Sequence, residues 1–251
     1  MKNDIREIAR ITGGVLHPAD ARGEISGIST DSRTTKPGEL FIPLRGPNFD
    51  GHDFLSLAVR SGAAACLSED AVNGLPVPVI VVPNCLKALG DLAADVRNRF
   101  AGPVVGVTGS SGKTTTKEML SGILSLTGPG LLTAGNFNNL IGLPLTLFRY
   151  STELEWMVLE MGMSARGEIA RLAEIASPTI GIITNIGLAH LETLHGMEGV
   201  ARAKGELFEA LPEGGYAIVN ADDDFVVNLP VANNVRRVLY GTHADAEIRG
   251  E

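Results

Sequence analysis

A glycine-rich turn at residues 108–115 holds the residue types that could do chemistry. Glycines in such a turn let backbone N–H groups converge on phosphate oxygens, Lys113 offers a cation, and the hydroxyl of Thr114 can reach Mg²⁺. A strict phosphate-binding loop would also have a glycine at the position of Val107, so the match is a shortened variant. The turn predicts a nucleotide triphosphate site whose contacts are Gly109, Ser110, Ser111, Gly112, Lys113, Thr114 and Thr115. The alternative is a purely structural corner between a strand and a helix.

Two candidate metal ligands follow the turn. Glu160 ends an apolar strand, and His190 lies in the loop after another apolar strand. In an open α/β sheet, ligands bind at the carboxyl ends of the strands. A carboxylate there could hold Mg²⁺, and the imidazole could be a second ligand or contact phosphate. The alternatives are a carboxylate satisfied by backbone amides and a structural histidine.

Two further polar stretches have roles that the residues alone leave open. Residues 136–139 contain three asparagines, which could bind a polar ligand or could cap a turn. Lys204 lies between small residues of a helix-like stretch, ahead of an apolar face. Charge patterning alone favours a solvated lysine that pairs with a carboxylate one turn away.

The elements that must position these residues alternate between strand and helix after residue 103. Apolar, β-branched runs predict strands, and apolar residues at steps of three and four predict helices. The alternation predicts an α/β domain with a mostly parallel, doubly wound sheet. Its expected strands are 103–108, 155–160, 179–184, 215–219 and 236–240, and its expected helices are 113–127, 167–176 and 198–211. Residues 242–251 are polar and show no closing element.

A smaller α/β domain is expected ahead of this sheet. Helical spacing and turn residues predict helices and short strands, and a helix over 84–100 is expected to connect the two domains. The expected division is 1–82 and 83–251. The expected elements are helices at 3–12 and 53–61, extended pieces at 25–29 and 40–44, and buried strands at 63–67 and 77–82.

Composition indicates an ordinary globular protein of 251 residues, 44% of them hydrophobic. The formal net charge of −8 argues against a nucleic-acid or anionic-membrane surface. Cys66 and Cys85 lack metal-binding spacing, so we expect buried free thiols in a reducing compartment. The first residues contain no apolar signal or anchor segment. We therefore expect a cytoplasmic protein without nucleic-acid or membrane partners.

Taken in order, several motifs resemble the Mur ligases, the ATP-dependent amino acid or peptide ligases of peptidoglycan synthesis. In the second domain they are Thr108–Glu118, Asn136–Asn139 with Ile141–Pro144, Glu160–Gly162 and Thr184–Leu191. In the first domain, Asp31–Arg33, Leu40–Gly46 and Asp50–Phe54 look most like the members that join D-alanyl-D-alanine to UDP-N-acetylmuramoyl-tripeptide. The resemblance covers essentially the whole chain.

The resemblance implies a three-domain enzyme: a domain for the UDP-sugar, a central ATPase domain, and a C-terminal domain that closes over the nucleotide. It implies that the tripeptide carboxylate takes the γ-phosphate of ATP and that the dipeptide amine then displaces phosphate. Lys113, His190 and Lys204 would be catalytic. Two Mg²⁺ ions would be held by Thr114, Glu160, His190 and Lys204, the last as a carbamate. Substrate contacts would be Ser32, Arg33, Arg45, Asp50, His52, Asn136 and Asn139.

The family pattern continues beyond residue 251. We therefore expect a truncated central domain, an absent C-terminal domain, and a monomeric fragment that is inactive as a ligase. The alternatives are another Mur-type amino acid ligase, a folylpolyglutamate synthase, or a non-catalytic nucleotide-binding module. The UDP-sugar-like first domain disfavours the folate enzyme, and the set of Lys113, Glu160 and His190 disfavours the non-catalytic module.

Overall fold

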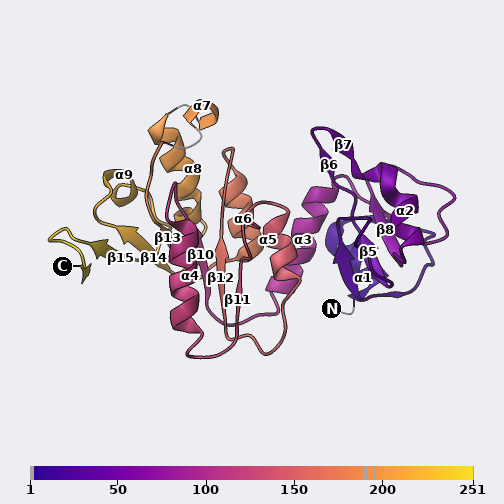
Figure 1. Cartoon of the computed structure of the whole chain (residues 1–251), viewed down its shortest axis with the longest axis horizontal. Helices are drawn as coiled ribbons and strands as arrows, with labels where there is room; N and C mark the ends of the chain where they lie inside the picture. The colour runs from indigo at the N-terminus through magenta and orange to yellow at the C-terminus, as the bar shows by residue number, and fades with distance from the viewer. Residues whose placement is uncertain (1–2, 189–190, 195, 251) are drawn as a thin grey trace. The chain divides into compact units, whose positions relative to one another are not determined.

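The computed structural model describes residues 3–188, 191–194 and 196–250. The chain divides into two compact units, Met1–Asp95 and Val96–Glu251, and each has its own sheet and its own core (Figure 1). The division falls within helix α3 (Cys85–Arg97). The boundary expected at 82/83 precedes this helix and stays a prediction.

The second unit is built on a seven-stranded sheet in which all neighbouring strands are parallel. From edge to edge its strands are β11 (Gly130–Leu132), β12 (Trp156–Glu160), β10 (Val104–Thr108), β13 (Ile180–Ile183), β14 (Tyr216–Asn220), β15 (Arg236–Gly241) and β16 (Ile248–Arg249). The chain moves to one side of β10 for β11 and β12 and to the other side for β13. The carboxyl end of β10 is therefore a topological switch point, where such sheets bind ligands.

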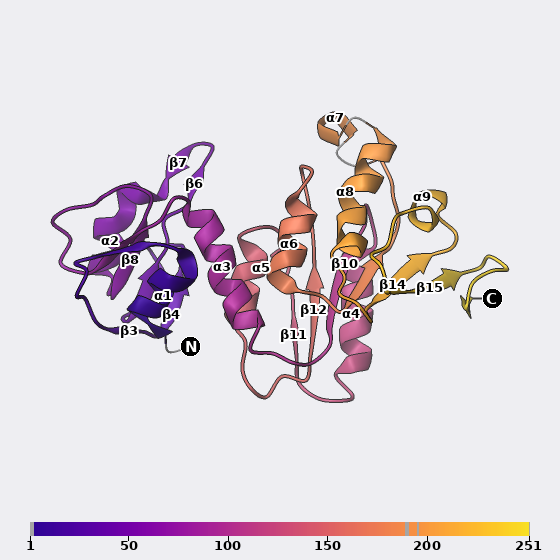
Figure 2. The same cartoon turned by 180° about the vertical axis from the view of Figure 1, so that it is seen from behind.

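Helices cover both faces of this sheet, which confirms the doubly wound architecture. Helix α4 (Lys113–Leu124) packs on one face, where its Leu120 and Leu124 contact the cluster that contains Val105 and Val107 of β10. Helices α6 (Glu168–Ala176) and α8 (Met197–Glu209) pack on the other face (Figure 2). A Cβ at Gly106 would lie 3.1 Å from Leu207, so the glycine lets α8 approach the sheet closely.

The alternation expected from the sequence is confirmed, with most element ends within two or three residues of the prediction. The short elements of this unit were not predicted. They are β11, β16 and the helices α5 (Gly142–Leu147), α7 (Leu191–Leu194) and α9 (Asp224–Val227). The expectation that residues 242–251 lack a closing element is wrong, because Ile248 pairs with Tyr240 and extends the sheet by one edge strand.

The first unit holds a five-stranded sheet in which β2 pairs antiparallel with β9 and the other pairs are parallel. Its order is β2 (Val15–His17), β9 (Val79–Val81), β8 (Ala65–Ser68), β5 (Glu39–Phe41) and β4 (Gly27–Ser29). The remaining elements are β1 (Asn3–Asp4), α1 (Ile5–Thr12), β3 (Glu24–Ile25), β6 (Arg45–Gly46), β7 (Phe49–Asp50), the 3₁₀ helix η1 (Gly51–Phe54) and α2 (Leu55–Arg60). Within the described ranges, no helix combines the length and apolar character needed to cross a bilayer.

Both cysteines are free and buried, as expected from the sequence. Burial raises the pKa of each thiol to about 12, so very little thiolate exists at neutral pH. We therefore predict that iodoacetamide labels neither Cys66 nor Cys85 in the native chain at pH 7.5 and labels both after unfolding in urea. Mass spectrometry of the alkylated protein measures this, and rapid labelling of either native thiol would contradict the burial of the two side chains.

Candidate active site

The turn after β10 forms an anion-binding helix N-terminus. Gly112, with φ of 78°, is the N-cap of α4, and no side chain caps this helix. Free N–H groups and the helix dipole at such an end attract phosphate. Gly109 has φ of 151°, and a Cβ there would lie 1.8 Å from the hydroxyl oxygen of Thr184. Only glycine fits at this position of the turn.

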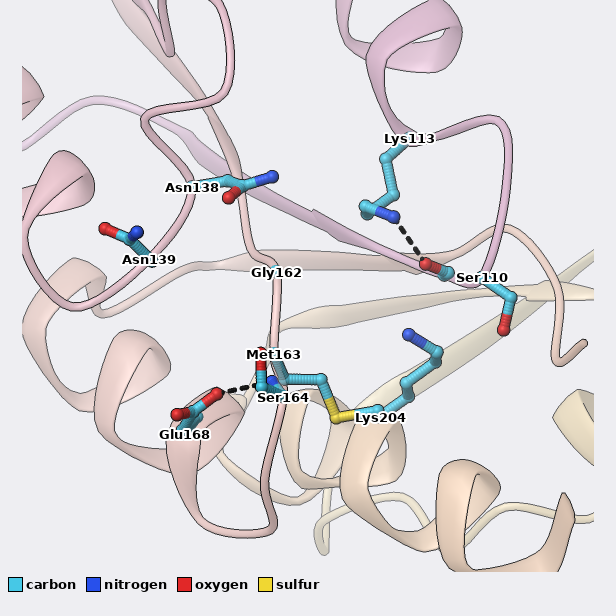
Figure 3. Close-up of a pocket in the computed structure, with 10 residues that line it drawn as sticks. Ser110, Lys113, Asn138, Asn139, Gly162, Met163, Ser164, Glu168 and Lys204 are labelled. Atoms are coloured by element: carbon cyan, nitrogen blue, oxygen red, sulfur yellow. Dashed lines mark hydrogen bonds between the residues drawn. The ribbon is translucent and has the colours of Figure 1, made fainter. Parts of the chain in front are cut away.

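A polar cavity of about 380 Å³ opens beside the turn (Figure 3). Lys113 reaches it from α4 and Lys204 from α8, and both amino groups point into the same space. In this state Lys113 Nζ donates to the carbonyl oxygen of Gly109 at 2.7 Å. The residues that line the cavity are Gly109, Ser110, Lys113, Asn138, Asn139, Gly162, Met163, Ser164, Glu168 and Lys204. Met163, Ser164 and Glu168 were not singled out from the sequence.

The loop after β13 braces the phosphate turn. The N–H of Ser111 donates to Asn185 Oδ1 at 3.0 Å, and Asn185 Nδ2 donates back to the Ser111 carbonyl at 3.2 Å. The Thr184 hydroxyl also donates to that carbonyl, at 2.6 Å. The N–H of Gly187 donates to the Ser110 hydroxyl at 2.8 Å. The turn is therefore held by residues 184–187 as well as by its own strand and helix.

Glu160 lies at the carboxyl end of β12 and is 2% exposed. Thr114, from the turn, donates its hydroxyl hydrogen to Glu160 Oε2 at 2.9 Å. Asn138 Nδ2 donates to Glu160 Oε1 at 2.8 Å. The Glu160 carboxylate and the Thr114 hydroxyl place oxygen atoms side by side, and Mg²⁺ prefers oxygen ligands when phosphate oxygens and water complete its coordination. The residues present therefore fit a magnesium ion next to the phosphate turn.

Lys204 is 3% exposed and lines the cavity. This contradicts the solvated lysine that charge patterning alone favours. The carboxylate nearest along its helix, Glu206, instead accepts hydrogen bonds from the backbone N–H groups of Gly167 and Ala170 at the start of α6. Burial, and then the charge of Lys113, lower the pKa of Lys204 from 10.5 to about 8. The amine is therefore still mostly protonated at pH 7, but about a tenth of it is neutral and nucleophilic.

The asparagine run divides between ligand and structural roles. Asn138, which the sequence did not distinguish from its neighbours, contacts Glu160, and Asn139 lines the cavity. The Asn139 side-chain oxygen also accepts from the N–H groups of Ile141 and Gly142 at the start of α5, which is the capping role. Asn136 does not line this cavity. Its backbone carbonyl accepts the N–H of Asn138 within the asparagine run. The predicted ligand roles of Asn136 and Asn139 stay predictions.

His190 lies outside the described residues. Among the residues that the structure does describe, no group of three or more His, Cys, Asp or Glu side chains is placed to hold a metal ion. Among the described residues, Glu160 and the Thr114 hydroxyl are neighbouring oxygen donors, and phosphate oxygens and water usually complete the coordination of Mg²⁺ at phosphate sites.

The first unit has a separate pocket of about 510 Å³ with a largely aromatic wall. Ser32 and Arg33, two of the predicted substrate contacts, line it. The Arg33 guanidinium donates to Asp31 at 2.7 Å, and these hydrogen bonds lower the pKa of Asp31 to about 2. The other lining residues are Thr30, Asp31, Phe41, Phe49, Gly51, Phe54 and Leu57. An apolar wall with a charged and hydroxylated rim suits a ring attached to polar groups.

The other predicted substrate contacts of the first unit lie in a network of their own. Arg45 contacts Asp50 at 2.9 Å and Glu69 at 2.7 Å, and His52 Nδ1 contacts Asp50 Oδ1 at 2.5 Å. Hydrogen bonds from His52 are the largest cause that lowers the pKa of Asp50 to about 2. Arg45, Asp50 and His52 do not line the 510 Å³ pocket, and their substrate roles stay predictions.

Family models match both units. A model described as the Mur ligase middle domain matches residues 107–251, and one described as the Mur ligase family, catalytic domain, matches residues 24–97. Two relatives named UDP-N-acetylmuramoyl-tripeptide--D-alanyl-D-alanine ligase are each 41% identical. The Escherichia coli (strain K12) protein aligns with 93% of this chain and 51% of its own length, and the Bacillus subtilis (strain 168) protein with 99% and 55%.

Solved structures agree with this. A crystal structure of MurF from Acinetobacter baumannii has a TM-score of 0.91 at 36% identity and covers 96% of this chain and 54% of that one. MurF from Thermotoga maritima, in complex with ADP, has a TM-score of 0.80 at 36% identity, over 87% of this chain and 51% of that one. The chain spans about half the length of the relatives it matches.

Proposed function

The chain belongs to the Mur ligase family, and from this membership we propose that it takes part in the ATP-dependent joining of D-alanyl-D-alanine to the carboxylate of UDP-N-acetylmuramoyl-tripeptide. The names of the similar proteins support this choice of substrates. The observation that carries it in this chain is the cavity lined by the phosphate turn, Lys113 and Lys204. The Thr114–Glu160 pair is joined to the cavity wall through Asn138. Such a site suits the activation of a carboxylate by the terminal phosphate of ATP.

The proposed reaction has two steps. A carboxylate oxygen of the tripeptide attacks the γ-phosphorus of ATP, the bond to the β-phosphate oxygen breaks, and an acyl phosphate and ADP form. The amine of the dipeptide then attacks the acyl carbon, the C–O bond to phosphate breaks, and a proton leaves the nitrogen as the amide forms. Phosphoryl transfer needs alignment and charge neutralisation more than covalent help from the protein.

The chain's own residues supply this alignment. The N–H groups at the start of α4 bind phosphate oxygens. Lys113 leaves the Gly109 carbonyl and places its ammonium against the β- and γ-phosphates, where negative charge is redistributed in the transition state. The hydrogen bonds from residues 184–187 restrain the turn, so less ordering is required when the nucleotide arrives.

Glu160, Thr114, His190 and Lys204 are the proposed metal-binding residues, for two Mg²⁺ ions. The metal would supply charge neutralisation for the phosphate oxygens. The neutral amine of Lys204 can add to carbon dioxide with loss of a proton, which forms a carbamate. Overall, the side chain changes from a cation to an oxygen donor suited to a hard metal. Its burial beside the cavity supports this role.

The pocket of the first unit is proposed to hold the uridine end of the UDP-sugar, with Ser32 and Arg33 at its rim and Phe49 and Phe54 as apolar walls. Arg45, Asp50, His52, Asn136 and Asn139 are retained as proposed substrate contacts. The protein is also proposed to work as a monomer in the cytoplasm, where peptidoglycan precursors of this class are assembled.

An acceptor comparison tests the proposed function. The full-length gene product that contains this chain is incubated with UDP-N-acetylmuramoyl-tripeptide, MgATP and either D-alanyl-D-alanine or single amino acids, and amide product and phosphate are measured. We expect amide product and phosphate when the acceptor is D-alanyl-D-alanine, and neither when it is a single amino acid. Product with single amino acids would favour another Mur-type ligase, and nucleotide binding without phosphate release under any acceptor would favour a non-catalytic module.

Carbamate formation at Lys204 is predicted to depend on pH. Because the pKa is lowered to about 8, the neutral amine increases about tenfold per pH unit below that value and levels off above it. At a fixed concentration of dissolved ¹³CO₂, the carbamate signal in ¹³C NMR should rise from one unit below this pKa to one unit above it. Lys204→Met should abolish the signal. A signal that persists in this variant would assign the carbamate to another amine.

A further inference from the structure

One lysine of the second unit is buried although no step of the proposed reaction uses it. Lys117 lies on α4, one turn after Lys113, and its side chain is 1% exposed. Its Nζ donates to the carbonyl oxygen of Thr133 at 2.8 Å. A buried ammonium group costs free energy unless charge and hydrogen bonds compensate it. A single carbonyl oxygen supplies only part of that compensation.

The charged groups that face Lys117 are two carboxylates. Glu118 Oε1 lies 3.2 Å from Nζ, but the Glu118 side chain is 59% exposed and solvent screens it. Glu160 Oε2 lies 3.9 Å away, and the side chains of both members of this pair are almost fully buried. In the part of the chain that the structure describes, Glu160 is the one buried carboxylate. Coulomb attraction is strongest where solvent is excluded, so the pair with Glu160 dominates.

Lys117 also supports the backbone around Glu160. Thr133 follows β11, accepts from Lys117 through its carbonyl, and accepts the Glu160 N–H through its hydroxyl at 3.0 Å. The segment that begins at Thr133 leads to Asn138, which donates to the other oxygen of Glu160. Lys117 therefore contacts both the Glu160 carboxylate and Thr133, where the segment that carries Asn138 begins.

We propose that Lys117 is a positioning residue: a permanent counter-cation that holds the Glu160 carboxylate in place, toward Thr114 and Asn138, before a metal ion arrives. This inference rests on the proposed function for the role of the metal, but the pairing itself does not. Removing either partner alone leaves one buried charge without its counterpart. Removing both leaves none, so the two substitutions should not be additive.

A double-mutant cycle tests the pairing in the 251-residue chain. Trp156 is the single tryptophan and lies on β12 with Glu160, so its fluorescence reports unfolding of the second unit in urea. We expect Lys117→Met and Glu160→Gln each to lower the midpoint by on the order of 1 M urea. In the double variant, the midpoint should fall by much less than the sum of the two single losses. Glu118→Gln, which removes the exposed partner, is the matched control and should leave the midpoint unchanged.

A metal arm separates positioning from plain structural support. With ADP present, midpoints are compared in EDTA and in Mg²⁺. A metal ion at Glu160 takes over part of the lysine's charge, so the Mg²⁺-dependent increase should be larger in Lys117→Met than in the unsubstituted chain and absent in Glu160→Gln. Additive losses, or equal Mg²⁺ increases, would overturn the proposal. If Mg²⁺ has no effect on the unsubstituted chain, the metal assignment fails, and the cycle still decides the role of Lys117. If Lys117→Met does not fold, Lys117→Gln replaces it in the cycle, both alone and combined with Glu160→Gln.

Discussion

Lys113→Ala is expected to lower kcat/KM for ATP in amide formation by about 10³-fold, because it removes the cation aimed at the terminal phosphates. Lys113 lines the cavity, and its only hydrogen bond recorded among the described residues is the one to the Gly109 carbonyl within the same turn. The substitution therefore removes little from the folded state. The loss should fall mainly on kcat, since the charge on the transferring phosphoryl group changes most in the transition state.

Steady-state phosphate release and amide formation measure this effect in the full-length gene product. Lys87→Ala is the control, because Lys87 is an exposed lysine of α3 that pairs with Asp91 one turn away. Binding of ADP by calorimetry should weaken in Lys113→Ala and remain unchanged in Lys87→Ala. Turnover that survives the loss of Lys113 would remove the basis for the nucleotide site.

Glu160→Gln is the second large effect expected, with a decrease in kcat of about 10² to 10³-fold at a fixed Mg²⁺ concentration. The amide keeps the shape of the carboxylate but removes the negative charge that would ligand the metal. It also leaves Thr114 Oγ1 and Asn138 Nδ2 with a weaker acceptor than the carboxylate they contact now. Activity should recover partly as Mg²⁺ is raised, because the defect lies in metal binding.

Titration of activity with Mg²⁺ measures this prediction. Glu174→Gln is the control, because Glu174 is an exposed carboxylate of α6 whose partner is Arg171. The Trp156 emission spectrum at the assay temperature shows whether each variant is folded. An unchanged Mg²⁺ dependence in folded Glu160→Gln would contradict the assignment of Glu160 as a ligand.

Much of the fold was accessible from the sequence because it depends on local periodicity. The strands β10, β12, β13, β14 and β15 and the helices α4, α6 and α8 have clear apolar patterns, and their alternation fixed the parallel arrangement. β11 and β16 are only three and two residues long, so neither has a pattern to detect. Their pairing depends on the neighbouring strands β12 and β15, which a local reading of the chain does not include.

The site divides in the same way. The phosphate turn is continuous in sequence, so its chemistry could be predicted directly. Which asparagine contacts Glu160 depends on the backbone conformation of residues 136–139. There the N–H of Gly162 donates to the Asn138 carbonyl at 2.8 Å. Lys117 has the pattern of a surface lysine next to Glu118, and its burial follows from the end of β11 lying against α4. Such distant contacts leave no signal in local spacing.

The brace between the phosphate turn and the loop after β13 gives the molecule an internal reporter. The Gly187 amide donates to Ser110, a residue of the turn, although 77 positions separate the two in sequence. Its exchange with deuterium therefore depends on how rigid the turn is. Slower exchange at Gly187 on addition of ADP would register occupancy of the turn from a position outside the cavity lining, without a label or a substitution.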